Sequence, residues 1–97
     1  EITEIEISNA LVGLTSKDSS KLLVDSAKMN NIKLSSAMAY RKKSHHEGGF
    51  IKVNKIETSK KNFISQKGSY IKIENEIIEN KKINVEQLYA ESMLSIK

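Results

Sequence analysis

The chain contains no cysteine, no proline and no tryptophan, and only five of its 97 residues are aromatic. Without cysteine there can be no disulfide bond, no thiolate zinc ligand and no cysteine nucleophile. Without proline, the ends of helices and strands must be located from Gly, Asn, Ser and charged residues. The scarcity of aromatic residues leaves Ile, Leu, Val and Met to build the core.

Long hydrophobic runs are also absent, because no apolar stretch exceeds three or four residues. A membrane-spanning helix needs about 20 such residues, so we expect no membrane segment and a cytoplasmic protein. The first residue is Glu, and no basic-then-apolar leader follows it, which indicates a mature chain or an excised domain. The length predicts one small domain over residues 1–97, and we find no internal repeat.

Residues 4–8 alternate polar and apolar side chains as a half-buried strand does, although Ile2, Ile5, Leu11 and Leu14 also fit one face of a helix. Two helices are predicted in the rest of the N-terminal half. Thr15 and Asp18 have the spacing of a capping box, and the apolar positions over residues 17–29 fit a period of 3.6. A second short helix is predicted over residues 35–44, because Ser35 can cap it and its last turn ends in three cations.

The second half is predicted to form a small sheet covered by a helix. Residues 50–56 and 70–74 alternate apolar and polar side chains, and residues 62–64 are a candidate third strand. Asn84 and Gln87 resemble a capping box at the start of an amphipathic C-terminal helix. We therefore predict an α+β fold with two N-terminal helices, a central antiparallel β-hairpin or three-stranded sheet, and a C-terminal helix. This order of elements is similar to that of winged-helix modules.

Positive charge is concentrated between residues 40 and 67. This segment holds eight of the sixteen Lys and Arg residues and only two acids, so it carries +6 whereas the whole chain carries +4. Clustered cations neutralise phosphates and release counterions, which favours binding to DNA or RNA. The predicted phosphate contacts are Arg41, Lys42, Lys43, Lys52, Lys55, Lys60, Lys61 and Lys67.

Aromatic residues interleave with these cations, which would suit single-stranded RNA or DNA if their rings lie on an exposed sheet face. They are Tyr40, Phe50, Phe63 and Tyr70. Arg41 is the only arginine available for guanine, and Asn54 and Asn62 are candidate adenine readers. The alternative interpretation is that the rings belong to the core and the lysines to a solvated surface.

A second hypothesis comes from the run His45-His46-Glu47. A histidine titrates near neutrality, the carboxylate can orient its ring, and the neighbouring cations can stabilise charge during phosphodiester cleavage. These three residues are therefore candidate catalytic groups of a metal-independent, ribonuclease-like toxin domain.

Nothing in the sequence indicates a cofactor or a metal. The run from His45 to Gly49 with Asn54 resembles the first part of the HNH nuclease motif, but no histidine follows His46, so we do not assign that family. Phosphate-binding glycine loops and zinc-ligand spacings are absent. A third hypothesis is a protein-interaction subunit whose basic surface meets an acidic partner, and a homodimer is a further candidate assembly.

Overall fold

The computed structural model describes residues 2–41, 48–82, 84, 87 and 90. The described residues form seven β-strands. Two are long, β1 (Ile2–Lys17) and β2 (Lys21–Tyr40), and β3 (Phe50–Thr58) is of intermediate length. The others are short: β4 (Phe63–Gln66), β5 (Tyr70–Ile73), β6 (Glu76–Ile77) and β7 (Asn80–Lys81).

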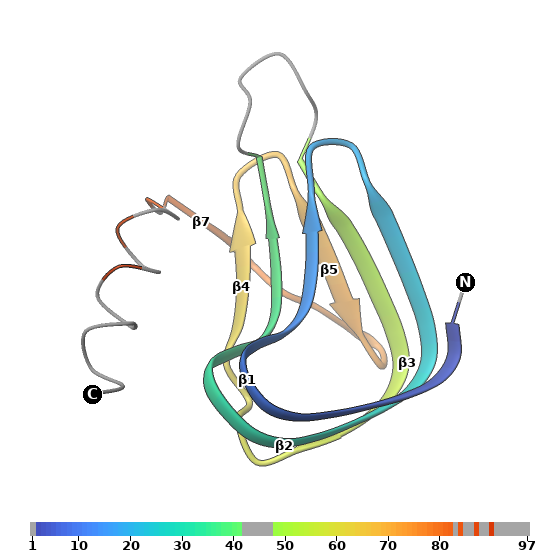
Figure 1. Cartoon of the computed structure of the whole chain (residues 1–97). Coiled ribbons are helices and arrows are strands. Elements are labelled where there is room, and N and C mark those ends of the chain that lie inside the picture. Colours follow the sequence, from blue (N-terminus) through green and yellow to red (C-terminus); the bar gives the residue numbers. More distant parts are fainter. Residues whose placement is uncertain (1, 42–47, 83, 85–86, 88–89, 91–97) are drawn as a thin grey trace.

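Most strands pair in parallel with a strand about one turn of chain away, so the chain winds as a flattened solenoid. β1 lies beside β2 along its whole length, from Ile2 opposite Val24 to Lys17 opposite Tyr40. The first part of β2 pairs with β3 and its last part pairs with β4. β3 then pairs with β5, and β4 pairs with β7. Each coil runs down one side of the molecule, bends, and returns up the other side (Figure 1).

The two sides of the solenoid enclose the main core. We call the side formed by residues 2–8, residues 21–29, β3 and β5 the first wall, and the side formed by residues 12–17, residues 35–40, β4 and β7 the second wall. Inward-facing residues of both walls make one apolar cluster, which includes Val24, Ile51 and Ile71 from the first wall and Leu14 and Ala37 from the second.

The bend between the walls uses asparagine in two successive coils. Asn9 and Asn31 both have positive φ, at 58° and 54°, a region that Asn tolerates better than most residues. The Asn31 side-chain amide donates a hydrogen bond to the Asn9 side-chain carbonyl at 2.7 Å. The same residue type therefore turns the chain in both coils and joins them.

The predicted α+β fold is wrong, and with it the winged-helix order. Residues 17–29 and 35–41, expected to be helical, belong to the end of β1, its turn and the long strand β2. Two features of β2 explain the error. Val24 and Ala27 both face the core although two residues lie between them, a spacing that also fits a helix. In addition, every residue from Ser35 to Tyr40 is buried, which removes the alternation typical of a half-exposed strand.

The strands expected over residues 50–56 and 70–74 do form, but β3 and β5 pair in parallel rather than as the predicted antiparallel hairpin. The candidate third strand at residues 62–64 overlaps β4, which pairs with the second wall. Of the expected C-terminal helix the structure describes little. Gln87 and Ala90 have helical backbones, and the Gln87 backbone N–H donates to the Asn84 side-chain oxygen at 3.0 Å, as a helix cap does. Its remaining residues lie outside the described part of the chain.

Candidate nucleic-acid interface

The predicted phosphate contacts lie at three places on the solenoid. Arg41 follows β2 and Lys67 lies in the turn after β4, both at the upper end in Figure 1. Lys60 and Lys61 occupy the lower turn between β3 and β4, and the side chains of Lys52 and Lys55 project from β3. The winding of the chain therefore separates cations that are close in sequence. The other predicted site residues lie outside the described part of the chain: Lys42, Lys43, His45, His46 and Glu47. The ribonuclease hypothesis depends on the last three and stays a hypothesis.

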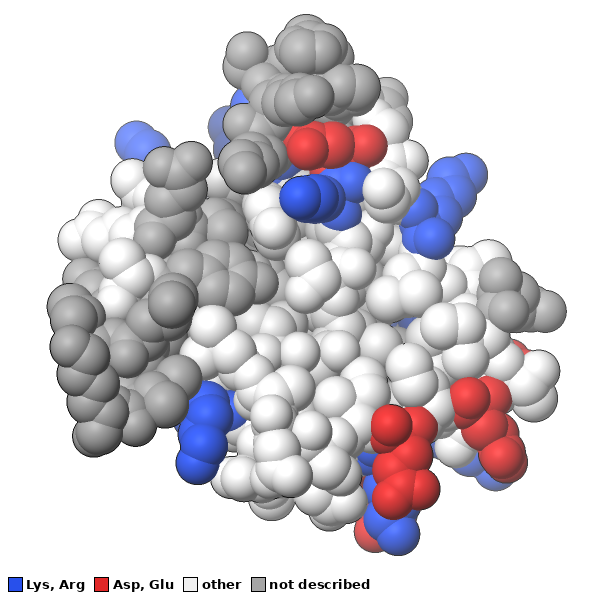
Figure 2. Space-filling view, viewed as in Figure 1, with Lys and Arg blue, Asp and Glu red and all other residues white. Residues whose placement is uncertain are grey.

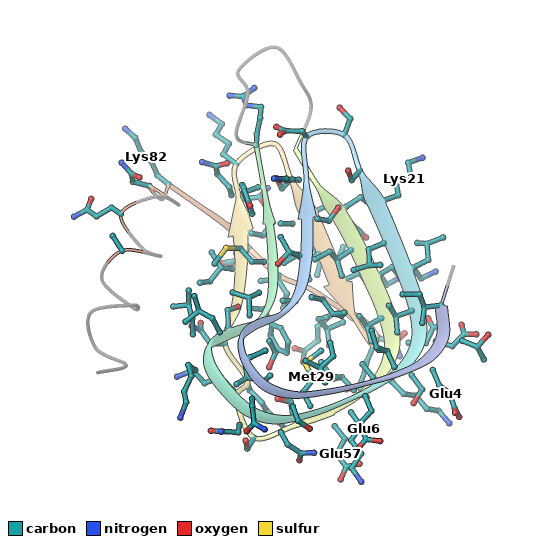
Figure 3. The ribbon with its side chains drawn as sticks, in the orientation of Figure 1. Glu4, Glu6, Lys21, Met29, Glu57 and Lys82 are labelled. Carbon is teal, nitrogen blue, oxygen red and sulfur yellow. The ribbon has the colours of Figure 1, made fainter. Side chains whose placement is uncertain are left out.

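Lys55 lies in acidic surroundings at the lower part of the first wall. It lines a shallow hollow together with Lys28 and four glutamates. Lys28 is flanked across the sheet by Glu6 on β1 and Glu57 on β3. Figure 2 shows acidic and basic side chains intermingled in this region, where Figure 3 labels Glu4, Glu6 and Glu57. Acids outnumber bases in this hollow, so it does not favour a polyanion.

The upper part of the first wall has a different outer surface. On the outer side of the sheet, β2, β3 and β5 place Lys21, Phe50 and Tyr70 side by side. Two residues further along the same strands, the next row of outward-facing side chains is Leu23, Lys52 and Lys72. The Phe50 and Tyr70 rings are stacked, with centroids 4.8 Å apart and planes inclined by 13°. We call this surface the basic-aromatic patch. Its six residues are Lys21, Leu23, Phe50, Lys52, Tyr70 and Lys72.

Apolar anchors hold the patch in register. Ile51 and Val53 on β3 and Ile71 on β5 are fully buried on the inner side of the wall. Because side chains alternate along a strand, their neighbours must face outward. β3 begins directly after Gly49, where the chain has come back to the first wall. There the Phe50 backbone N–H donates to the Ser20 carbonyl oxygen at 3.0 Å. The same residues that fill the core therefore fix the positions of the outward rings and lysines.

The patch contains three cations and no acid. Lys52 and Lys72 are direct neighbours on adjacent parallel strands, an arrangement in which like charges destabilise a sheet. In the outward row below, Asp25 accepts a hydrogen bond from the Asn54 side-chain amide at 3.0 Å. An anion seated between the two lysines would relieve their mutual repulsion.

Sequence reasoning found half of this patch. Phe50, Lys52 and Tyr70 were candidate contacts, whereas Tyr40 is buried and Phe63 packs against the core. Lys21 and Lys72 were missed because they lie outside the basic segment. A signal for Lys72 was present, since Phe50-Ile-Lys-Val and Tyr70-Ile-Lys-Ile repeat one pattern in successive coils. The statement that the chain lacks an internal repeat overlooked this pattern.

No family model, curated protein or solved structure matches the chain. Within the described ranges, no helix has the length and apolar character needed to cross a membrane. Over the same residues, His, Asp and Glu side chains do not gather in threes as they would around a metal ion. The candidate site therefore has to be argued from its own geometry.

Proposed function

We propose that the protein binds single-stranded nucleic acid, DNA or RNA, through the basic-aromatic patch. The observation that carries the proposal is the stacked Phe50–Tyr70 pair, bordered by three lysines on the outer side of one wall. Sequence-tolerant single-strand binders combine cations that follow the phosphates with aromatic rings that stack against bases. The patch has both components within two rows of one sheet.

The adjacent lysines support an anionic ligand. Lys52 is exposed and Lys72 is partly exposed, so both ammonium groups can reach a phosphate. In the absence of a ligand their proximity raises the free energy of the folded state, and a bound phosphate removes that penalty. The repulsion is thus a property of a binding surface rather than of a merely solvated one.

The aromatic pair supports a ligand with flat rings. Phe50 and Tyr70 are only partly buried, and their stack stands on the outer side of the wall. Stacking of a base on such a ring contributes about 1–3 kcal/mol. A polyanion without bases would lose this contribution.

The test is a titration of the protein against fluorescent single-stranded DNA and RNA, with inorganic polyphosphate as a competitor that has charge but no bases. Three lysine–phosphate contacts predict a slope of about −2 in log affinity against log salt concentration. Replacing Tyr70 by Leu keeps apolar cover over the sheet but removes the ring. Tyr70→Leu should weaken binding to the oligonucleotides and leave polyphosphate binding unchanged.

Lys72→Glu separates binding from folding. It replaces a like-charge neighbour of Lys52 by an opposite one, so thermal unfolding should show a gain in stability of up to about 1 kcal/mol. Its affinity for oligonucleotides should fall on the order of tenfold. The matched control is Lys61→Glu at the lower turn, which makes the same charge change outside the patch. Equal weakening by both variants, or no binding by the native chain at low salt, would contradict the proposal.

A further inference from the structure

The two ends of the solenoid differ in how they are closed. At the end formed by the last coil, β6 folds back antiparallel on β5, with Lys72 opposite Ile77. The chain then crosses to the second wall, and Ile78 packs against the core on the way. The Ile78 backbone N–H donates to the Ile71 carbonyl at 2.9 Å. This crossing covers the apolar interior and occupies the outer edge of β5.

The end formed by β1 has no such cover among the described residues. β1 pairs with β2 on one edge, and no other described strand pairs with its opposite edge. Its inward-facing residues Ile2, Ile5 and Ile7 are only half-buried, whereas their partners one coil later, Val24, Ala27 and Met29, are 2–3% exposed. Among the described strands, the 16-residue β1 therefore has no partner on its outer edge, and the apolar residues at this end of the core are only partly covered.

Three of the usual protections of a strand edge are missing from β1, whose register with β2 is broken only between Ala10 and Val12. Natural edge strands are blunted by β-bulges, by proline, by inward-pointing charges or by being very short. The chain contains no proline, and the inward-facing positions of β1 named above are apolar. An unprotected edge of this length is a template for pairing with another strand.

We propose that β1 is the dimer interface of the protein, with two copies joined head to head by antiparallel pairing of their β1 strands. The β1 strand of a second copy fits this edge, because it has the same bent shape and the same apolar residues at the end of its core. The closed opposite end argues against head-to-tail stacking, since β6 already lies along the edge of β5. A two-fold axis makes the contact self-complementary and finite.

The bent shape of the coil determines which parts of the two strands meet. Figure 1 shows the two walls rising on either side of the bend. A two-fold axis that superimposes the bends of two copies would lie along the midline between these walls. It places the 2–8 part of one β1 antiparallel to the 10–17 part of the other. The first part carries Glu4 and Glu6 and no base, and the second carries Lys17 and no acid. The arrangement therefore brings opposite charges together and keeps the glutamates of the two copies apart.

The first test is sedimentation equilibrium of the whole chain over a concentration series. The native protein should be in monomer–dimer equilibrium, and Ile5→Lys should raise the dissociation constant at least about tenfold by placing a charge on the inner side of the edge. The matched control is Ile77→Lys on β6, which is 64% exposed at the closed end. A native chain that is monomeric throughout, or equal weakening by the two variants, would overturn the proposal.

A second test does not depend on a core substitution. Ser8 is exposed beside the bend, close to the proposed axis, and the chain has no cysteine of its own. Ser8→Cys should form a covalent dimer rapidly on mild oxidation, whereas Ile77→Cys should not. Efficient linkage between a Ser8→Cys chain and an Ile77→Cys chain would instead demonstrate head-to-tail contact and refute the two-fold arrangement. Both tests concern β1 and are independent of the nucleic-acid proposal.

Discussion

The two walls of the solenoid share the long strands β1 and β2 and yet have different outer surfaces. In the first wall, residues 21–30 of β2 alternate between core and solvent except for the break between Val24 and Ala27, and the outer side carries charges and the basic-aromatic patch. In the second wall, residues 35–40 of the same strand are all buried. There Met38, Tyr40 and Ile64 form a separate apolar cluster on the side opposite the main core, with Val12 and Leu34 packed against it.

This contrast indicates that β2 is a surface strand in the first wall and an internal strand in the second. A strand buried on one side needs alternating residues, whereas a strand buried on both sides needs a continuous run of small and apolar ones. In the second wall, buried hydroxyls replace larger side chains. The Ser35 hydroxyl lies 2.7 and 2.6 Å from the Ala37 and Asn62 carbonyl oxygens and can donate its one proton to either, which satisfies it without solvent. Function is therefore expected on the first wall, and stability should depend most on the second wall and on the turn that connects it back to the first.

The largest expected effect lies where the chain returns from the second wall to the first. A Cβ atom on Gly49 would lie 1.9 Å from the Ser16 carbonyl oxygen, which is backbone and cannot move aside. We expect Gly49→Ala to lower the free energy of unfolding by more than about 3 kcal/mol, measured by urea denaturation.

Gly68 provides the control for that prediction. It has a positive φ of 89°, but no atom lies within 4 Å of a Cβ built on it. Gly68→Ala should lower stability by only about 1 kcal/mol, the conformational contribution alone. Similar losses at the two glycines would show that close packing at Gly49 is not what limits the turn.

The next effect compares the two walls along one strand. Met38 is 0% exposed in the second wall, whereas Leu23 is 37% exposed in the first. Met38→Ala should lower the free energy of unfolding by about 2–5 kcal/mol, and Leu23→Ala by less than about 1 kcal/mol, in parallel denaturation experiments. Nearly equal losses would mean that the outer side of the second wall is not the buried layer described above.

The smallest effect is a dependence on pH at the upper end of the second wall. Burial raises the pKa of the Tyr40 hydroxyl above its ordinary value of about 10, and the nearby negative charge of Asp18 adds to the increase. The folded state then holds this proton more tightly than the unfolded state does. The associated stability is present below about pH 10 and is lost as the pH rises through the higher pKa of the folded protein.

Two variants separate these causes in the same denaturation experiment. Tyr40→Phe should flatten the decline in stability above about pH 10, because the titrating group is gone. Asp18→Asn should make the decline slightly smaller, because it brings the folded-state pKa of Tyr40 closer to the unfolded value, and Asn tolerates the positive φ of this position. A decline that is unchanged in Tyr40→Phe would assign it to another group.

Part of the fold could be predicted from the sequence, for a local reason. The strands at residues 50–56 and 70–74 were found because their alternation and their β-branched residues are local signals. β2 was mistaken for two helices, since the inward pair Val24 and Ala27 has a spacing compatible with a helix and the Ser35–Tyr40 run has no alternation. Parallel pairing could not be derived, because the register joins residues 15 to 29 positions apart, such as Phe50 and Tyr70.

The candidate site could also be predicted only in part, because local composition identifies only residues that are close in sequence. Lys52 and Phe50 were identified because they lie in the cation-rich segment 40–67, and Tyr70 because it follows closely after that segment. Lys21 and Lys72 come from neighbouring coils, so a local count of charge could not include them. The same count joined Lys52 to Lys60 and Lys61, which the bend places at the lower end of the molecule.

The sequence by itself determined the absence of disulfides, the net positive charge, the aliphatic composition of the core and the short alternating strands of the second half. Only the tertiary structure decided that strands from successive coils lie in parallel, that one wall faces solvent while the other is buried on both sides, and which lysines share a surface. The physical reason is that strand hydrogen bonds are made with residues one coil away. Neighbours in space are therefore set by the length of each coil, which local composition does not encode.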